Sequence, residues 1–341
     1  MLDVASPRDM LELNRKPIFC ASSSMEKAIP HPSNPLKQPK DLAALLKTIV
    51  GINITPFGSD LSIDFNALGK NLDSLLAAGV KVITPCGNTG EFSSLTVDEC
   101  LEIMSFAAAR IKGKATLIAG IGYAIGTAVR MAEHAEAAGY DSVMVHHPTH
   151  PFLSDTGYVN YVRAIAENVD IPVIPYVRSA RISNQSLYEL ARVKNVVAMK
   201  YAVNDLQRFG DLVANSPSDV EVTWVCGTAE GWAPFFFAAG ATGFTSGLVN
   251  VAPQFSFKML SALQSNDRKE TLELWKTIKP FEDLRARNES ENNVSVVKEA
   301  MHQLGLGSRH VRPPITELSS QDRSRVRQIL EGWGLSPRNE A

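Results

Sequence analysis

Short β-branched segments alternate with longer helical patterns between residues 49 and 263, and this alternation constrains the fold more than any other feature. Each apolar segment predicts a strand buried on both faces, and each amphipathic stretch after it predicts a helix. The expected strand–helix pairs are 49–57 with 64–78, 80–86 with 97–111, 116–121 with 127–138, 142–147 with 156–168, 172–177 with 185–193, 196–201 with 205–214, 222–227 with 231–239, and 243–249 with 253–263.

Eight strand–helix pairs in one continuous stretch are typical of a closed parallel barrel. An open doubly wound sheet is the competing architecture, but it should carry a glycine-rich phosphate-binding turn after its first strand. The corresponding segment, Thr55-Pro-Phe-Gly58, lacks that pattern. The predicted fold class is therefore α/β, a (β/α)8 TIM barrel over residues 47–265. Three more helical patterns at 269–287, 293–304 and 320–333 predict a C-terminal helical extension over 266–341.

Residues 1–46 differ from the remainder of the chain. The stretch 22–40 is rich in Ser, Pro and Lys and has no periodicity, which predicts an extended or flexible N-terminal arm. The first residues carry acidic side chains and no apolar core, so neither a secretory nor a transit peptide is expected.

Composition excludes several classes of partner. The net charge of −2 is not that of a protein that binds nucleic acid or an anionic membrane surface, and no apolar run is long enough to span a bilayer. The four cysteines (Cys20, Cys86, Cys100 and Cys226) form no Cys-x-x-Cys pair. This spacing favours the reducing cytoplasm over a disulfide framework or a zinc cluster.

Lys200 ends the apolar segment Val196-Val-Ala-Met and precedes a polar turn. Burying a lysine is costly, because its charged form loses hydration, and burial favours the neutral amine. A neutral amine can attack a carbonyl carbon to form a Schiff base. A lysine that extends from a strand end into water is the alternative interpretation of this segment alone.

Chemically capable side chains collect at the carboxyl ends of six expected strands. The active sites of TIM barrels lie at that end, so we expect these side chains to converge. We take Lys200 and Tyr176 as candidate catalytic residues. The candidate substrate-binding residues are Gly87, Asn88, Thr89, His147, Arg178, Arg181, Gly227, Thr245 and Ser246.

Each of these groups also has a structural interpretation. The turn Gly87-Asn-Thr-Gly-Glu91 offers backbone amides and a hydroxyl to a small carboxylate, although such turns are common. Arg178 and Arg181 suit a carboxylate clamp or a surface ion pair. The histidines of His146-His-Pro-Thr-His150 invite a metal interpretation, but the prolines exclude the helical face on which a His pair binds zinc, so no metal is expected.

With these residues in place, the chain from Ile49 onward resembles the dihydrodipicolinate synthase / N-acetylneuraminate lyase family of Schiff-base aldolases and dehydratases. The turn Gly87–Glu91 is similar to the family's Gly-Thr-Thr-Gly-Glu turn. The other similar motifs are Pro175-Tyr176, Val197-Ala-Met-Lys200, Gly243-Phe-Thr-Ser-Gly-Leu-Val-Asn250 and Val311-Arg-Pro-Pro-Ile315.

The resemblance implies a role for each matched residue. Lys200 would form the imine, Tyr176 would move protons, and Thr89 with its neighbouring amides would hold the carboxylate of a 2-oxo acid. Gly227 and Thr245 would line the pocket. Arg181 falls where the synthases place a carboxylate-binding arginine. The resemblance also implies a small-molecule 2-oxo acid substrate, no cofactor, and a homo-oligomer that is a tetramer or a dimer.

Two departures from the synthase pattern affect the expected activity. Asn88 replaces the second hydroxyl of the turn, and the stretch His146–His150 lacks the tyrosine that synthases place after the fourth strand. An amide does not relay a proton as a hydroxyl does. The segment Glu91-Phe-Ser-Ser-Leu-Thr96 is instead similar to that of 5-dehydro-4-deoxyglucarate dehydratases, whereas Lys200-Tyr-Ala202 is not typical of that branch.

Three hypotheses follow. The first is a Schiff-base lyase that acts on pyruvate or a related 2-oxo sugar acid by aldol chemistry or dehydration, with 4-hydroxy-tetrahydrodipicolinate synthase as the alternative activity. The second is a catalytically silent protein that binds a 2-oxo acid, suggested by the missing hydroxyls. The third is a metal-dependent protein, and it rests on the histidines alone.

Overall fold

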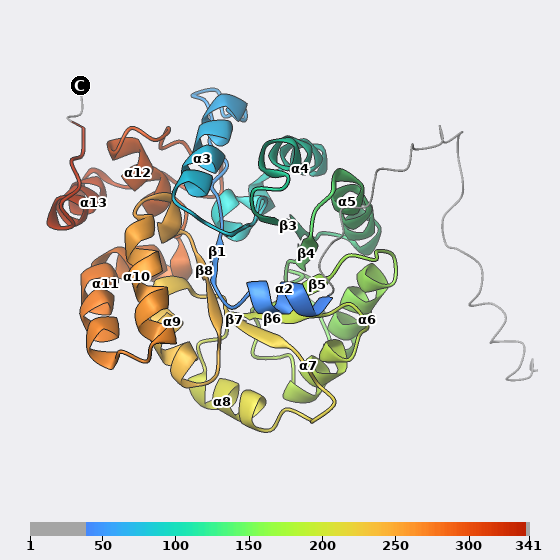
Figure 1. Cartoon of the computed structure of the whole chain (residues 1–341). Helices are drawn as coiled ribbons and strands as arrows, with labels where there is room; N and C mark the ends of the chain where they lie inside the picture. The colour runs from blue at the N-terminus through green and yellow to red at the C-terminus, as the bar shows by residue number, and fades with distance from the viewer. Residues whose placement is uncertain (1–38, 339–341) are drawn as a thin grey trace, which may run out of the picture. The chain divides into compact units, whose positions relative to one another are not determined.

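The computed structural model describes residues 39–338 and contains the predicted (β/α)8 barrel. All eight strands are parallel and pair in chain order, and the last pairs with the first. Helices surround them (Figure 1). The strands are β1 Ile49–Gly51, β2 Val82–Ile83, β3 Thr116–Ile121, β4 Ser142–Val145, β5 Val173–Val177, β6 Ala198–Tyr201, β7 Thr223–Cys226 and β8 Gly243–Ser246.

The helices of the barrel follow the predicted order. Several begin at a side-chain cap: Asp64 accepts from the amide of Ala67, and Thr96 forms a reciprocal capping box with Glu99. The barrel helices are α3 Phe65–Ala77, α4 Val97–Ile111, α5 Ile125–Ala138, α6 Asp155–Ala166, α7 Asn184–Ala191, α8 Leu206–Ala214, α9 Ala229–Ala238 and α10 Pro253–Gln264.

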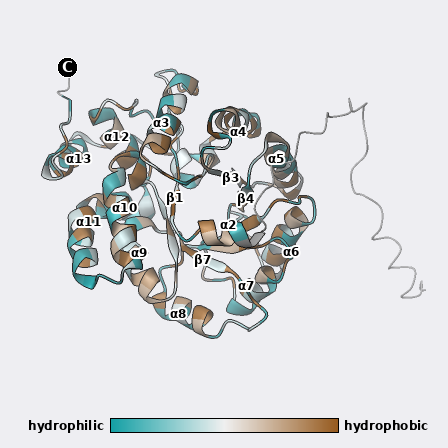
Figure 2. Ribbon diagram, in the orientation of Figure 1, coloured by the Kyte–Doolittle hydropathy of each residue, from teal (hydrophilic) through white to brown (hydrophobic). Residues whose placement is uncertain are grey.

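Strand side chains alternate between the barrel interior and the layer beneath the helices. The interior apolar cluster includes Val82, Ile174 and Val225, whereas the larger outer cluster includes Val143 and Phe244. Apolar residues therefore dominate the strands, and the surrounding helices combine hydrophobic and hydrophilic faces (Figure 2). This alternation decides which strand-end residues enter the barrel mouth.

The structure differs from the sequence-based expectation in residues 39–45, which were assigned to the N-terminal arm. They form the helix α2, Pro39–Leu45, which lies across one end of the barrel (Figure 1). Leu42 and Leu46 pack into the interior cluster, and the Thr223 hydroxyl donates to the carbonyl of Ala43. Thr223 is the first residue of β7, so α2 lies at the amino end of the strands. It closes the barrel at the end opposite the candidate site. The expected arm over residues 1–38 lies outside the described residues.

The first two strands are shorter than predicted. Pairing in β1 stops at Gly51 and in β2 at Ile83, whereas the apolar patterns extend to residues 57 and 86. The extra residues leave the ladder as buried loop, and Cys86 takes a left-handed conformation with φ of 57°. A residue in that conformation cannot continue a strand, so the chain turns into the barrel mouth at this point.

The C-terminal extension is helical, as predicted, and comprises α11 Arg268–Ser290, α12 Ser295–Gln303 and α13 Ser320–Gly332. Non-helical torsions at Arg287, Asn288 and Glu289 interrupt the end of α11. The three helices lie together on one side of the barrel, next to α10 (Figure 1). None of the helices in residues 39–338 combines the length and apolar character that a membrane crossing requires.

The packing of α2 against the barrel interior at the amino end predicts the effect of one substitution. Leu42 is 2% exposed inside the interior cluster, so Leu42→Ala should lower the free energy of unfolding by about 2–5 kcal/mol. Urea denaturation monitored by circular dichroism measures this change. The control is Leu272→Ala on α11, where the leucine is 48% exposed and the loss should stay below about 1 kcal/mol. Equal losses in the two variants would contradict the assignment of α2 to the barrel core.

Candidate active site

Lys200 and Tyr176 lie side by side at the carboxyl end of the barrel. They are direct partners in the pairing of β5 with β6, and both point to the interior, since Ala198 and Ile174 two residues earlier belong to the interior cluster. The Lys200 Nζ atom stands 4.0 Å from the centroid of the Tyr176 ring. The two candidate catalytic residues are thus brought together.

The Lys200 amine is buried without a carboxylate partner among the described residues. Lys200 is 5% exposed, and burial lowers the pKa of its amine from 10.5 to about 7. The positive charge of Arg178 contributes to this lowering, and Cys226 opposes it weakly. About half of the amine is therefore neutral near pH 7, which is the state that a nucleophile needs.

The Tyr176 phenol is also buried, and burial raises its pKa above 10 despite opposing effects from Arg178 and Asn88. It stays protonated at neutral pH and is a proton donor. Its oxygen accepts a long hydrogen bond of 3.4 Å from the Asn88 amide nitrogen. The backbone of Tyr176 is held by the hydroxyl of Tyr158, which donates to its carbonyl oxygen at 3.2 Å.

The turn that follows β2 presents two free amides. The amides of Gly90, Glu91 and Phe92 all donate within the turn, whereas those of Asn88 and Thr89 have no acceptor among residues 39–338. Thr89 is 5% exposed. Adjacent free amides form a concave site suited to a carboxylate.

Two neighbouring segments hold this turn in place. The Thr55 hydroxyl donates to the carbonyl of Gly90 at 2.7 Å. A Cβ atom at Gly87 would lie 2.4 Å from Ile52, so only glycine fits there. On the opposite side, a Cβ atom at Gly247 would lie 3.2 Å from the Thr89 methyl group, which places Thr89 next to the end of β8.

Gly227 and Thr245 complete the interior ring next to Lys200. A Cβ atom at Gly227 would lie 3.1 Å from Lys200 Cγ and 3.0 Å from the carbonyl oxygen of Tyr201, so glycine leaves room for the lysine side chain. Thr245 is 5% exposed, and its hydroxyl donates to the carbonyl of Cys226 at 3.4 Å. Both residues thus lie beside Lys200, and their role in lining a substrate pocket stays a prediction.

Ser246 is not brought to the mouth, contrary to expectation. It follows Thr245 by one residue and therefore points outward, where its hydroxyl donates to Glu230 at 2.5 Å and lies 3.2 Å from the Ser256 hydroxyl. Glu230 is fully buried, and burial together with the charge of Glu282 raises its pKa to about 7. Ser246 thus belongs to a polar cluster behind the barrel wall.

His147 also points out of the barrel, and His146 takes the interior position. The ring of His147 packs on the ring of Tyr158, with 5.0 Å between the ring centroids. The ring of His146 stacks on the ring of Phe92, with 4.0 Å between the centroids, and it makes an edge contact with the ring of Tyr176. His146 is not among the residues predicted for the site, although its spacing of two from the interior residue Met144 indicates that it points inward.

His146 is a neutral hydrogen-bond donor at its Nε2 atom, because that atom lies 2.8 Å from the carbonyl oxygen of Cys86, which can only accept. Burial, with smaller contributions from the charges of Lys200 and Arg178, lowers the pKa of His146 to about 3. His150 lies elsewhere, where its Nδ1 atom accepts from the amide of Phe152. Among residues 39–338 no three His, Cys, Asp or Glu side chains group as metal ligands.

Arg178 and Arg181 lie on the exposed loop after β5. Arg181 contributes to a cavity of about 360 Å³ between this loop and the loop after β4, and His147 and His150 also line it. The Arg181 guanidinium has one weak contact, to the carbonyl of Leu153 at 3.5 Å. Two cations and two imidazoles near the barrel mouth thus suit an anionic or hydroxylated group.

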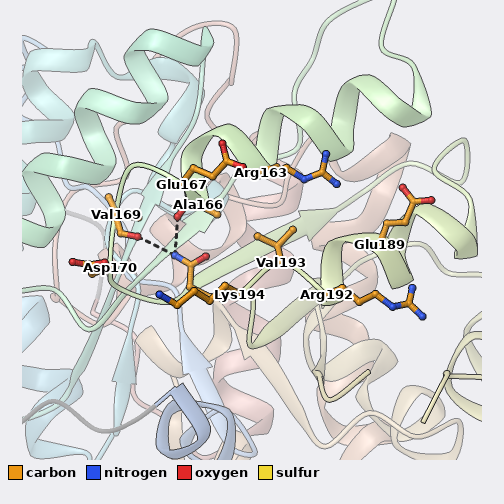
Figure 3. A pocket seen from close by; sticks show the side chains of 10 residues that line it. Arg163, Ala166, Glu167, Val169, Asp170, Glu189, Arg192, Val193 and Lys194 are labelled. Atoms are coloured by element: carbon orange, nitrogen blue, oxygen red, sulfur yellow. Dashed lines mark hydrogen bonds between the residues drawn. The ribbon is translucent and has the colours of Figure 1, made fainter. Parts of the chain in front are cut away.

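A second cavity, of about 540 Å³, lies in the loops that enter β5 and β6, at the amino end of the barrel. Asn195 lines it and donates to the carbonyls of Ala166 and Val169, which are labelled in Figure 3. The charged side chains around it, including Arg192 with its partner Asp219, belong to the surface. This cavity is at the opposite end from Lys200 and has no part in the candidate site.

Comparisons with known proteins agree with this geometry. The family model for the dihydrodipicolinate synthetase family matches residues 45–332. A probable 5-dehydro-4-deoxyglucarate dehydratase from Rhizobium rhizogenes is 29% identical over 87% of this chain and 98% of its own length. A 4-hydroxy-tetrahydrodipicolinate synthase from Dechloromonas aromatica is 32% identical over 84% of this chain and 98% of its own.

Solved structures are also similar. The dihydrodipicolinate synthase from Oceanobacillus iheyensis superimposes with a TM-score of 0.85 and 43% identity, and covers 87% of this chain and 99% of its own. The corresponding structure from Bacillus clausii gives a TM-score of 0.84 and 45% identity, with 86% and 100% covered.

The low pKa of Lys200 predicts a pH-dependent stability change. The unfolded chain binds a proton at Lys200 below pH 10.5, whereas the folded chain binds it only below about pH 7, so the buried amine destabilises the fold increasingly as pH falls between these values. Lys200→Met should therefore be more stable than the parent by a few kilocalories per mole at pH 6.5, and the difference should shrink by pH 9.5. Urea denaturation at both pH values measures it.

Lys194→Met provides the control, because Lys194 is exposed on the surface and its removal should produce no such pH-dependent difference. A stability difference for Lys200→Met that stays constant between pH 6.5 and 9.5 would contradict a lowered pKa of the buried amine.

Proposed function

Since this chain belongs to the dihydrodipicolinate synthetase family, it is a class I lyase or hydro-lyase of the Schiff-base type, and we propose that Lys200 is its imine-forming residue. The substrate proposed is pyruvate or a related 2-oxo acid. The observation that carries the assignment is the buried Lys200 amine, which has no carboxylate partner in residues 39–338 and stands 4.0 Å from the ring centroid of Tyr176.

The neutral Lys200 nitrogen adds to the C2 carbonyl carbon, and the proton lost from nitrogen passes to the former carbonyl oxygen. Tyr176 supports this transfer because its raised pKa keeps the phenol protonated next to the reacting nitrogen. The carbinolamine hydroxyl then takes up a further proton, for which Tyr176 is the proposed donor, and leaves as water. The nitrogen lone pair forms the C=N bond, and the resulting protonated imine withdraws electrons from C3. Loss of a C3 proton leaves electrons that expel a group from C4 or attack an aldehyde, and the imine is finally hydrolysed.

The free amides of Asn88 and Thr89 are the proposed site for the substrate carboxylate. They lie in a turn next to β8, and Asn88 reaches Tyr176 with its side chain, so the same turn contacts the proposed proton donor. A carboxylate bound there fixes the 2-oxo carbon near Lys200, and this positioning is a large part of catalysis in such a site.

Within the family, we favour a dehydratase or aldolase acting on a 2-oxo sugar acid. Asn88 donates an amide hydrogen to Tyr176 where a synthase would place a hydroxyl, so the turn cannot pass a proton onward. The cavity beside Arg181 suits the distal hydroxyl or carboxylate groups of a sugar acid. The similarity to proteins called synthases keeps 4-hydroxy-tetrahydrodipicolinate synthase as the second candidate.

Two further proposals follow from the family and the composition. We expect a homo-oligomer, as a tetramer or a dimer, and a cytoplasmic location. The described cysteines (Cys86, Cys100 and Cys226) are all free and buried, which is compatible with a reducing compartment.

Borohydride reduction in the presence of pyruvate tests the proposed imine. We expect a covalent adduct on Lys200, found by mass spectrometry of tryptic peptides, and none in Lys200→Arg, because a guanidinium stays protonated. The initial rate of trapping should rise as pH increases through about 7, where the amine loses its proton. Lys194→Arg is the matched control and should trap normally. An adduct on another lysine, or none, would refute the assignment.

A substrate panel separates the candidate reactions. We expect turnover of 2-oxo sugar acids, and much slower formation of 4-hydroxy-tetrahydrodipicolinate, because the hydroxyl relay is interrupted at Asn88. Chromatography of products measures both. Faster synthase turnover would reverse the order of the two candidates, and imine formation without turnover of any sugar acid or aldehyde would favour a 2-oxo acid binding protein.

A further inference from the structure

Glu91 ends the turn that carries Asn88 and Thr89, yet its carboxylate has no part in the chemistry proposed above. It is 2% exposed and takes a left-handed conformation, with φ of 60° and ψ of 35°. Such a conformation is unfavourable for a residue with a side chain and persists only where the surroundings fix it. The question is which contacts do so.

The contacts come from the C-terminal extension. The carboxylate of Glu91 forms an ion pair with Lys298 of α12, and both side chains are fully buried. Its second oxygen accepts from the backbone amide of Arg312 at 3.0 Å. Lys298 also donates to the carbonyl of His310 at 2.7 Å. Both anchors thus come from a region that contributes no strand to the barrel.

Arg312 joins the same turn to the start of α4 and to the loop after β1. Its guanidinium donates to both oxygens of Glu99, at 2.7 and 2.8 Å, and to the carbonyls of Ser94 and Leu61. The ring of Phe57 lies under two cations, 4.0 Å from Lys298 Nζ and 4.4 Å from the Arg312 guanidinium carbon. Contacts of this number and burial leave the turn little freedom.

We propose that Glu91, Lys298 and Arg312 are positioning residues for the reaction, which fix the free amides of Asn88 and Thr89 at the distance that the substrate carboxylate requires. This inference rests on the proposed function of Lys200. Glu91 lies two residues from Thr89, and the amide of Glu91 itself closes the turn on Asn88, so a shift of its carboxylate is passed directly to the binding amides.

The buried pair also explains why neutralising one partner should act on the turn. A carboxylate left alone in an apolar site moves toward water, because an uncompensated buried charge is strongly unfavourable. The left-handed torsion of Glu91 would relax at the same time. Both changes displace the turn rather than Lys200, so binding of the 2-oxo acid should weaken while the amine keeps its reactivity.

The test measures borohydride trapping against pyruvate concentration for Lys298→Met, Glu91→Gln and the double variant. We expect Lys298→Met to raise the half-saturating pyruvate concentration by about tenfold or more, with the same maximal extent of adduct. Glu91→Gln leaves an oxygen that can accept from the Arg312 amide and should have a smaller effect. The double variant has no unpaired charge and should be less impaired than Lys298→Met alone.

Arg287→Met is the matched control, because Arg287 forms a bidentate ion pair with Asp322 within the same extension but away from the turn. This variant should have a lower melting temperature, but its half-saturating pyruvate concentration should stay within about twofold of that of the parent. Trapping is measured well below every melting temperature, and Glu91→Gln carries the test if Lys298→Met does not fold. The inference would be overturned if the Glu91 and Lys298 variants had the same half-saturating pyruvate concentration as Arg287→Met. A parent protein that forms no adduct would instead overturn the proposed function.

Discussion

The withdrawal of one lysine amine from water, without a compensating carboxylate, is the constraint on which the site depends. A barrel supplies such a place because its interior layers are filled by side chains from parallel strands, and the last layer lies just below the loops. Lys200 occupies that layer with Tyr176 at its side. The destabilisation from the buried amine is tolerated because the remainder of the interior is apolar and is closed at the amino end by α2.

Much of this arrangement was predictable from the sequence because both the fold and the site follow short-range rules. The alternation of apolar segments and helical patterns indicated the number and order of strands. The location of active sites in barrels predicted that Lys200, Tyr176, Gly227 and Thr245 would lie together, as they do in the structure. The difference at Ser246 has a simple cause. A single-residue shift along a strand reverses the face, so Thr245 points inward and Ser246 outward. By the same alternation His146 takes the interior position, whereas His147 lines the cavity beside Arg181.

Other features were beyond sequence reasoning for a different reason. The contact between Glu91 and Arg312 joins residues 221 positions apart, and no local pattern indicates that a carboxylate in a turn meets a cation in a C-terminal loop. The helix α2 was missed because a short segment next to a proline-rich stretch shows too few turns for a period of 3.6 to be recognised. The second substrate stays a proposal because loops after β4 and β5, and not the barrel, form its cavity.

Two buried lysines in the described part of the chain differ in the partners of their amines. Lys200 and Lys298 each stand 4.0 Å from the centroid of an aromatic ring, and burial lowers the pKa of both, to about 7 and about 8. Lys298 faces the carboxylate of Glu91, which raises its pKa against burial and occupies the amine. Lys200 instead lies beside the phenol of Tyr176 and has no carboxylate partner among residues 39–338. Burial alone therefore does not distinguish the two lysines, and the lack of an acidic partner among residues 39–338 is what supports Lys200 as the proposed nucleophile.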